Sequence, residues 1–477
     1  MNQFMGADVI FSLRQELMVT AIVFILLVMK VGMAELRTGV ILNVVNLLLL
    51  ANVILGCLGG PVSVAFNGMF HTNPLIVLEK NMLNLATLLV SLLAYDWLKG
   101  HRHVAEFYML LLATLTGFFF MISAGNLLMF YLGLELSTIP LAALSSFDLE
   151  KRQSSEGAMK FILSAAFSSA LLLFGISLLY GATGTLDFGV LSRRLDGSAY
   201  QLFAFILILS GFAFKVSAAP FHFWTADVYE GSPVPVTAYL SVVSKGAVFF
   251  IFIQVLYIVF KPMAINWYKI LVLLSVLSMT VGNLFALRQE RLKRLLAFSS
   301  VAQSGFILAG VIGSSRAGEA SVVYFILIYI FSNLAAFGVV SLISAQTGKE
   351  GIRDYRGLYT NNKALSWVMA ISLFSLAGIP PTAGFFGKFF LLLAGAGKGN
   401  YVFIGIAALN MVVSLYYYLR VVKAIFMDTP DEPIGKLNIP LMPNIAFVIC
   451  VVGIMVTGLA GGVYAYIYSL SGGLYGY

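Results

Sequence analysis

Long apolar stretches follow one another along most of the chain. From residue 14 onwards, runs of about 18 to 25 mostly apolar residues recur, and each can cross about 30 Å of hydrocarbon as an α-helix. The runs begin near residues 14, 38, 81, 105, 126, 156, 199, 234, 266, 292, 319, 363, 400 and 440. The short connecting segments leave no room for a folded soluble domain. The pattern predicts an all-α polytopic membrane protein with about 14 transmembrane helices.

Two of these segments are too long for one straight membrane span. Residues 199 to about 229 and 363 to about 396 would each form a helix of about 45 to 50 Å at about 1.5 Å per residue. Each contains helix breakers near its middle, since proline removes a hydrogen bond and clashes with the preceding turn. The breakers are Pro220 in the first segment, and Gly378, Pro380 and Pro381 in the second. We therefore predict discontinuous helices at the seventh and twelfth spans.

The two interrupted spans suggest an internal repeat. They are five spans apart, so spans 4–8 and 9–13 form two five-helix units, and the odd number of spans inverts one unit relative to the other. Such paired interruptions mark the ion pathway of many transporters. Alternatively, the prolines are only the helix breakers that membrane helices commonly tolerate. The predicted divisions are three N-terminal helices in residues 1–104, a first unit in 105–260, a second unit in 261–426 and a C-terminal helix in 427–477.

The composition agrees with a membrane protein, since 60% of the residues are hydrophobic and only 10% are charged. The net charge of +8 comes from basic residues spread over loops, without the aromatic-interleaved basic patch of a nucleic-acid-binding protein. Most of these residues lie in loops that follow odd-numbered spans, so that side should be cytoplasmic and both termini should face outside. Cys57 and Cys450 lie far apart in apolar runs, which supports neither a disulfide framework nor a cysteine-ligated iron–sulfur cluster.

Five ionisable residues fall inside the predicted spans. Glu135, Lys215 and Lys245 lie near the middle of their spans, and Lys388 just follows the break in the twelfth. A charge at the centre of a membrane helix costs about 2.5 to 3.5 kcal/mol on insertion scales, so these residues point to a function. Lys160 lies about two turns from the start of its span, so its long side chain can also reach the interface without any functional role.

These residue types favour a proton pathway. Burial favours the neutral forms of lysine and carboxyl groups, whereas a nearby opposite charge favours the ionised forms, so each group can change protonation when its neighbour moves. His222 follows the first break and can pass protons between the two units near neutral pH, or it can instead satisfy carbonyls that the break sets free. A metal-cation site would want several oxygen ligands at one place. One glutamate among four lysines favours protons over sodium or calcium, and we predict no metal site.

Several motifs together resemble a known family. They are "YLGLELSTIPLAAL", "EGAMKFILSAAFSSALLLFG", "GFAFKVSAAPFHFWTADVYEGSPVPVTAYLSVVSKGA", "KRLLAFSSVAQSGFILAG" and "GIPPTAGFFGKFF". The chain resembles the antiporter-like membrane subunits of proton-pumping NADH-quinone oxidoreductase, respiratory complex I, which are related to Mrp-type cation/proton antiporters. The resemblance covers roughly residues 80–425. The lysine in "GFFGKFF" argues against the subunit M family and the lack of a long C-terminal amphipathic helix argues against the subunit L family, so the resemblance is best to the subunit N family.

The resemblance implies fourteen helices with two inverted five-helix units. By motif, it implies proton-translocating roles for Glu135, Lys160, Lys215, His222, Lys245 and Lys388. It also implies a non-redox subunit of an NADH:quinone oxidoreductase, with no cofactor in this chain and with FMN, iron–sulfur clusters and quinone in partner subunits. The expected partners are the other membrane-arm subunits, including the other antiporter-like subunits, the lipid bilayer and protons, but no nucleic acid. The expected location is the bacterial inner membrane, with an organellar energy-coupling membrane left open. The alternatives are a subunit of an Mrp-type sodium/proton antiporter and a purely structural subunit.

Overall fold

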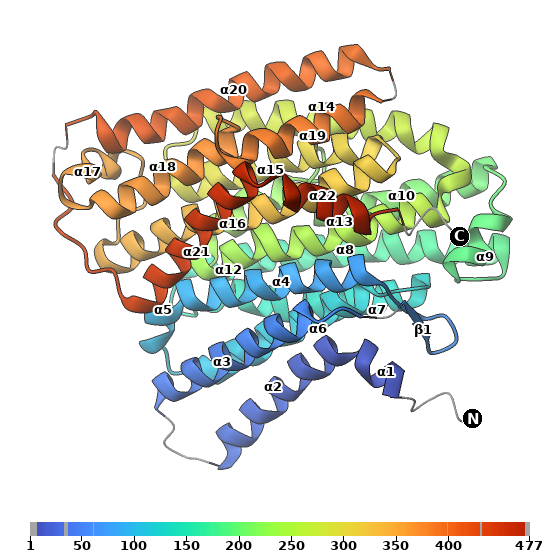
Figure 1. Ribbon diagram of the computed structural model, residues 1–477, viewed down its shortest axis with the longest axis horizontal. Coiled ribbons are helices and arrows are strands. Elements are labelled where there is room, and N and C mark those ends of the chain that lie inside the picture. The colour runs from blue at the N-terminus through green and yellow to red at the C-terminus, as the bar shows by residue number, and fades with distance from the viewer. Residues whose placement is uncertain (1–6, 33–36, 61, 398, 430–431, 473–477) are drawn as a thin grey trace.

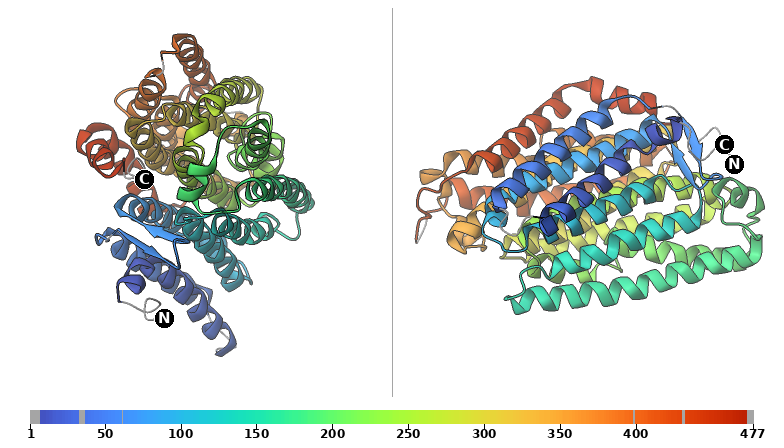
Figure 2. Two further views of the ribbon diagram at one scale, coloured as in Figure 1. Left: turned by 90° about the vertical axis from the view of Figure 1, so that its right-hand side faces the viewer. Right: turned by 90° about the horizontal axis from the view of Figure 1, so that it is seen from below.

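The apolar runs fold into helices that lie side by side, mostly along one direction, and the described chain begins and ends at the same end of this bundle (Figures 1 and 2). The computed structural model describes residues 7–32, 37–60, 62–397, 399–429 and 432–472. Within these residues, twelve helices are long and apolar enough to cross a membrane. The other two predicted spans are built from shorter helices, whereas the total of about 14 crossings stays a prediction.

The N-terminal part contains α1 (Ala7–Ser12), α2 (Arg14–Gly32), α3 (Thr38–Cys57), β1 (Ser63–Ala65), β2 (Phe70–Thr72), α4 (Pro74–Leu93) and α5 (Tyr95–Lys99). The strands β1 and β2 pair antiparallel. The next part contains α6 (Val104–Ile122), α7 (Leu127–Ser145), α8 (Arg152–Thr183), α9 (Phe188–Arg194), α10 (Ala199–Lys215), α11 (Phe223–Gly231), α12 (Val234–Tyr239), the π-helical η1 (Leu240–Ser244), α13 (Lys245–Gln254), the π-helical η2 (Val255–Val259) and the 3₁₀ turn η3 (Lys261–Met263).

The remaining part contains α14 (Ala264–Leu287), α15 (Leu292–Ile312), α16 (Arg316–Thr347), the 3₁₀ turn η4 (Arg353–Tyr355), α17 (Leu358–Asn361), α18 (Lys363–Ala377), α19 (Ala383–Ala396), α20 (Tyr401–Phe426), α21 (Leu441–Leu459) and α22 (Gly461–Leu470). The predicted seventh span is thus the pair α10 and α11, and the predicted twelfth span is the pair α18 and α19. The interruptions predicted from Pro220 and from the Gly378–Pro381 segment are confirmed.

The third long helix, α4, begins at Pro74 rather than near residue 81 as predicted. The Asn73 side chain caps it by accepting a hydrogen bond from the Ile76 amide at 2.8 Å. Proline is favoured in the first helical turn, because the missing amide hydrogen has no partner there in any case. The boundary predicted near residue 81 was therefore wrong, because the capping signal at Asn73 and Pro74 starts the helix about two turns earlier.

The earlier start of α4 places two charged residues inside a helix. Glu79 and Lys80 fall in a loop on the predicted boundaries, yet they are only 3% and 1% exposed. Lys80 forms an ion pair with Glu16 of α2, and the Glu16 side chain is equally buried. The expectation that these charges lie outside the span is therefore wrong, because the partner needed to bury the lysine comes from another helix.

The two predicted five-helix units share several features. The third helix of each unit, α8 and α16, is 32 residues long and ends at a glycine with a left-handed backbone, with φ 67° at Gly184 and φ 70° at Gly348. The fourth element of each unit is the interrupted pair. These parallels support the division into two units and the flanking segments, which stays a prediction.

The most deeply buried helices carry much of the candidate chemistry. The apolar core of α15 is completely buried, and α16 and the continuous segment from α12 to η2 are almost as enclosed. By contrast, only about a third of the apolar core residues of α2, α20 and α21 are buried, and these helices lie at the outside of the bundle (Figure 2). A charge on the central helices is therefore kept away from lipid and needs partners from neighbouring helices.

Candidate functional site

The first helix interruption, between α10 and α11, is fixed by serines of the second predicted unit. The Ala219 amide donates a hydrogen bond to Ser278 Oγ of α14 at 2.8 Å. Ser304 Oγ of α15 donates a hydrogen bond to the Val216 carbonyl at 2.7 Å. Backbone groups freed inside a membrane need such partners, because no water replaces the lost helical bonds. The break at Pro220 thus contacts two helices, α14 and α15, of the second predicted unit.

Lys215 is the last residue of α10 and is 7% exposed. Its Nζ donates a hydrogen bond to Thr138 Oγ1 of α7. Glu135 lies one turn earlier on α7, and its buried Oε1 has no hydrogen-bond partner. The two residues interact electrostatically, but within the described residues no ion pair joins them. Thr138 therefore holds the lysine close to the carboxylate without direct contact.

Lys245 begins α13, directly after the π-helical η1, and is 3% exposed. Its Nζ donates hydrogen bonds to Ser300 of α15, at 2.7 Å to Oγ and 3.2 Å to the carbonyl oxygen. A cavity of about 10 Å³ is lined by Lys215 and by Ser244, the residue before Lys245. That volume is about what one water molecule needs, so the cavity has room for a single water beside Lys215 and Ser244.

Lys388 lies in α19, just after the second interruption, and is fully buried. Its Nζ donates hydrogen bonds to the carbonyl oxygens of Leu376 at 2.7 Å and Ala377 at 3.2 Å, which end α18. Gln303 Nε2 of α15 donates to the same Leu376 carbonyl at 2.9 Å and to the Tyr418 hydroxyl at 3.2 Å. The lysine thus uses carbonyl groups that the helix break sets free.

One polar turn of α15 connects the three lysine sites. This turn consists of Ser300, Gln303 and Ser304, which lie within five residues on one side of the helix. Ser300 accepts a hydrogen bond from Lys245. Gln303 donates to the Leu376 carbonyl oxygen, which also accepts a hydrogen bond from Lys388. Ser304 donates to the carbonyl oxygen of Val216, the residue after Lys215. Sequence reasoning missed this turn, although "SSVAQS" is a polar stretch inside an otherwise apolar helix.

His222 lies in the first interruption, just before α11, and is 5% exposed. Its ring stacks on Phe223 with 4.7 Å between centroids, and it lies 6.5 Å from the ring of Phe285 on α14. The ring interacts with the backbone of Pro220, while its Nδ1 is buried without a hydrogen-bond partner. The histidine therefore contacts both predicted units and interacts with the backbone at the break, whereas its role in proton transfer stays a prediction.

Lys160 differs from the other candidate lysines, because its side chain is 45% exposed. Its Nζ forms ion pairs with Glu156 at 2.9 Å and with Asp227 of α11 at 2.7 Å. Arg294 of α15 also pairs with Asp227 at 3.2 Å. Lys160 is therefore part of a charged network at the rim of the bundle, as the interfacial alternative predicted, and within the described residues no hydrogen bond or ion pair joins it to the buried lysines.

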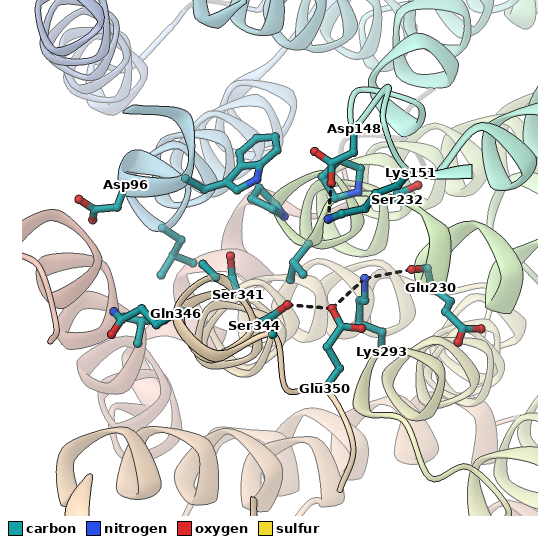
Figure 3. A pocket seen from close by; sticks show the side chains of 18 of the residues that line it. Asp96, Asp148, Lys151, Glu230, Ser232, Lys293, Ser341, Ser344, Gln346 and Glu350 are labelled. Atoms are coloured by element: carbon teal, nitrogen blue, oxygen red, sulfur yellow. Dashed lines mark hydrogen bonds and ion pairs between the residues drawn. The ribbon is translucent and has the colours of Figure 1, made fainter. Parts of the chain in front are cut away.

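Sequence reasoning also missed Lys293 as a candidate residue. This lysine lies in the first turn of α15 and is only 7% exposed. It lines a cavity of about 720 Å³ together with Glu230 and Glu350 (Figure 3). The available signal was its place in "RLKRLLAFSS", where a helix that begins at Leu292 already includes the lysine.

The described residues contain no group of three or more histidine, cysteine or acidic side chains that could hold a metal ion. Cys57 and Cys450 are both free thiols. The ionisable groups that the fold brings together at the two breaks are lysines, a histidine and one carboxylate. Such groups can hold and exchange protons, each through a lone pair on nitrogen or oxygen.

The interrupted helices and the buried lysines define an antiporter-like helical membrane protein. Residues 124–414 match the family model described as NADH:quinone oxidoreductase/Mrp antiporter, transmembrane. The chain belongs to this family.

Relatives at the level of the whole chain agree with this assignment. The chain is 48% identical to the NADH-quinone oxidoreductase subunit N of Phocaeicola vulgatus over 84% of this chain and 85% of that one. It is 45% identical to the protein of the same name from Azobacteroides pseudotrichonymphae, over 86% of each chain. These relatives confirm the resemblance to the subunit N family.

Solved structures share the fold. A chain of respiratory complex I from Thermus thermophilus is 30% identical and superposes with a TM-score of 0.83, over 96% of this chain and all of that one. A chain of the Mrp complex from Dietzia, 20% identical, superposes with a TM-score of 0.84 over 97% of this chain and 96% of that one, which shows the shared fold alone. The predicted fold class is confirmed.

Proposed function

We propose that this chain is the proton-translocating, non-redox membrane-arm subunit of an NADH-quinone oxidoreductase. The observation that carries the proposal is the row of three buried lysines, Lys215, Lys245 and Lys388. One polar turn of α15 connects their three sites. Burying three lysines in a membrane protein is costly, and the cost is reasonable only if their change of protonation is used. The relatives are named as subunits of NADH-quinone oxidoreductase, and we propose that this complex drives the changes of lysine protonation.

Each candidate residue takes a distinct role in this proposal. Lys215 carries the proton of the first unit. Glu135, one turn before Thr138 on α7, changes the proton affinity of Lys215 when the distance between the carboxylate and the lysine changes. A water molecule in the small cavity lined by Lys215 and Ser244 passes the proton on toward Lys245, the residue after Ser244. The polar turn of α15 then leads to Lys388, which releases the proton toward the outside.

His222 and Lys160 support this route from its edges. His222 joins the two units at the first interruption and can exchange a proton near neutral pH through its unpaired ring nitrogen. Lys160 forms the rim network with Asp227 and supplies protons or positions α11. No metal takes part in the proposed route.

The energy for translocation comes from outside this chain. FMN, iron–sulfur clusters and quinone belong to partner subunits, and their electron transfer acts on this subunit as an electrostatic or conformational signal. A signal of this kind moves protons only if it changes the relative stability of two states of the lysine row. The other membrane-arm subunits, including the antiporter-like ones, are the proposed partners that transmit it.

The proposed location is a bacterial inner membrane, with both termini outside and the loops rich in lysine and arginine in the cytoplasm. The N-terminal three helices, two inverted units and C-terminal helix are the proposed divisions of the chain. The second candidate function is an Mrp-type sodium/proton antiporter subunit, which shares the fold.

The direct test is to tag the chain, extract it in mild detergent and analyse what is purified with it. We expect flavin and iron–sulfur absorbance and quinone reduction by NADH. Purification of other hydrophobic subunits alone, together with sodium-dependent pH changes in vesicles without an electron donor, would favour the antiporter. Full activity after neutralisation of Glu135 or Lys388 would favour a purely structural subunit.

A further inference from the structure

A group of exposed basic side chains lies where α2 ends, α3 begins and α5 leads into α6, at the end of the bundle opposite to both described chain ends (Figure 1). Lys30 lies in the last turn of α2, Arg37 directly precedes α3, Lys99 ends α5 and Arg102 lies in the loop before α6. Thr38 Oγ1 donates a hydrogen bond to the Lys99 carbonyl oxygen at 3.3 Å. The start of α3 and the end of α5 are therefore adjacent.

Two acidic side chains lie near this basic group. Glu106 of α6 forms an ion pair with Lys30 at 2.7 Å and contacts Nδ1 of His103 at 3.2 Å. Partial burial raises the pKa of Asp96 on α5, and nearby Lys99 offsets part of this rise. The acids thus neutralise only part of the basic group. The members that form no ion pair in the described part of the chain are Arg37, Lys99 and Arg102.

Next to the basic group, α2 and α3 expose apolar side chains in long strips. The strip on α3 runs from Val40 to Ile54, which is about 21 Å at about 1.5 Å per residue. The helix α3 contains no charged residue. Strips of this length and composition suit acyl chains rather than water. Their exposed members include Phe24, Val28 and Val31 on α2 and Leu47, Leu50 and Ile54 on α3.

Two aromatic residues of α5 mark the level of the membrane interface. The Tyr95 hydroxyl donates a hydrogen bond to Asn43 Oδ1 at 2.9 Å, and the Trp97 ring packs on His101 with 4.2 Å between centroids. Tyrosine and tryptophan are enriched where acyl chains meet lipid headgroups, because one end of each ring is apolar and the other is polar. Lys99 follows these two residues directly, so the basic group lies at the level of the headgroups.

We propose that this surface binds an anionic phospholipid of the cytoplasmic leaflet. The phosphate group accepts hydrogen bonds from Arg37, Lys99 and Arg102, and the acyl chains lie along the apolar strips of α2 and α3. Guanidinium groups suit phosphate because each can donate two parallel hydrogen bonds to it. Unpaired positive charge beside an apolar strip matches a charged headgroup joined to apolar tails. The lipid site goes beyond the proposed function and does not depend on proton translocation.

The charge of the site sets the size of the expected effect. One lysine or arginine near the surface of an anionic leaflet strengthens binding by about fivefold. Three such residues together therefore contribute about a hundredfold. Because salt screens exposed charges, the preference for an anionic lipid should also fall as the salt concentration rises.

The test is photolabelling of the complex that contains this chain, in phosphatidylcholine vesicles with a trace of photoreactive phosphatidylglycerol. Labelled peptides are identified by mass spectrometry. We expect label on α2 and α3, and about a hundredfold less in a chain with Arg37→Gln, Lys99→Gln and Arg102→Gln. The matched control also loses three exposed basic residues, but at the opposite end of the bundle, and should be labelled normally on α2 and α3. Its substitutions are Arg193→Gln, Lys261→Gln and Lys269→Gln.

Two comparisons make the result decisive. Photoreactive phosphatidylcholine should label α2 and α3 far more weakly than phosphatidylglycerol, and equal labelling by the two lipids would overturn the site. Equal labelling of the unmodified chain and the variant without Arg37, Lys99 and Arg102 would also overturn it. So would cross-linking of α2 and α3 to another protein subunit without lipid label, which would assign the surface to that subunit.

The salt dependence tests the same site without any substitution. High salt should lower phosphatidylglycerol labelling of the unmodified chain and leave phosphatidylcholine labelling unchanged. Phosphatidylglycerol labelling that does not respond to salt would contradict a site built on exposed basic side chains.

Discussion

The substitution Lys388→Met distinguishes a proton-carrying lysine from one that only braces the second helix break. Methionine keeps the length and the apolar stem of the side chain and removes the amine. Two hydrogen bonds are lost, to the carbonyl oxygens of Leu376 and Ala377. One of these carbonyls keeps a donor, since Gln303 Nε2 still binds Leu376 at 2.9 Å.

The structural and functional costs of this change differ strongly. Hydrogen bonds to a charged group contribute about 1.5 to 3 kcal/mol each, but burying one ion costs several kcal/mol even after the protein relaxes. The two terms oppose each other, so we expect a net change in stability within about 2 kcal/mol. Removing a positioned proton acceptor, by contrast, slows proton transfer by about 10² to 10⁴. The variant should therefore assemble and lose proton pumping.

The assay is the amount of assembled complex on a native gel, followed by proton pumping per electron in proteoliposomes with a pH-sensitive dye. Lys269→Met, at an exposed position on α14, is the matched control and should leave both quantities unchanged. Normal pumping by Lys388→Met would refute the proton-carrying role. Loss of assembly would refute the reasoning on stability and assign the lysine a bracing role.

Two further changes test the packing. Lys80→Met leaves the buried Glu16 without its partner and should lower the free energy of unfolding by about 3 to 5 kcal/mol, so little complex should assemble. Adding Glu16→Leu should restore assembly. Equal assembly of the single and double variants would contradict this account. In Gly384→Ala, the new Cβ would clash with the Ser375 carbonyl oxygen, so α19 cannot pack on α18 and assembly should fail. Gly405→Ala, with no atom within 4 Å, is the control, and normal assembly of Gly384→Ala would show that this close approach is absent.

The sequence predicted the interrupted helices because their signal is local. Pro220 and the Gly378–Pro381 segment prevent a continuous helix whatever surrounds them, and the length of each segment exceeds a membrane span. The burial of Lys215, Lys245 and Lys388 also followed from local information, because each lies deep within an apolar run.

The partners of these residues depended on how the helices pack. Ser300 and Gln303 are ordinary polar residues in the sequence, and only their hydrogen bonds with Lys245 of α13 and the Leu376 carbonyl of α18 make them part of the site. Glu16 and Lys80 are 64 residues apart, so no local pattern predicts that each allows the other to be buried. Lys160 shows the reverse case, because its acidic partner Asp227 stabilises it at the rim instead of in the row of buried lysines.

The most direct test of the central claim is the number of protons pumped per electron by the complex that contains Lys215→Ala. The account predicts an assembled complex that pumps few or no protons through this subunit and reduces quinone slowly under coupled conditions. A complex that assembles and pumps the same number of protons per electron as the unmodified one would contradict the claim that Lys215, Lys245 and Lys388 form the proton path.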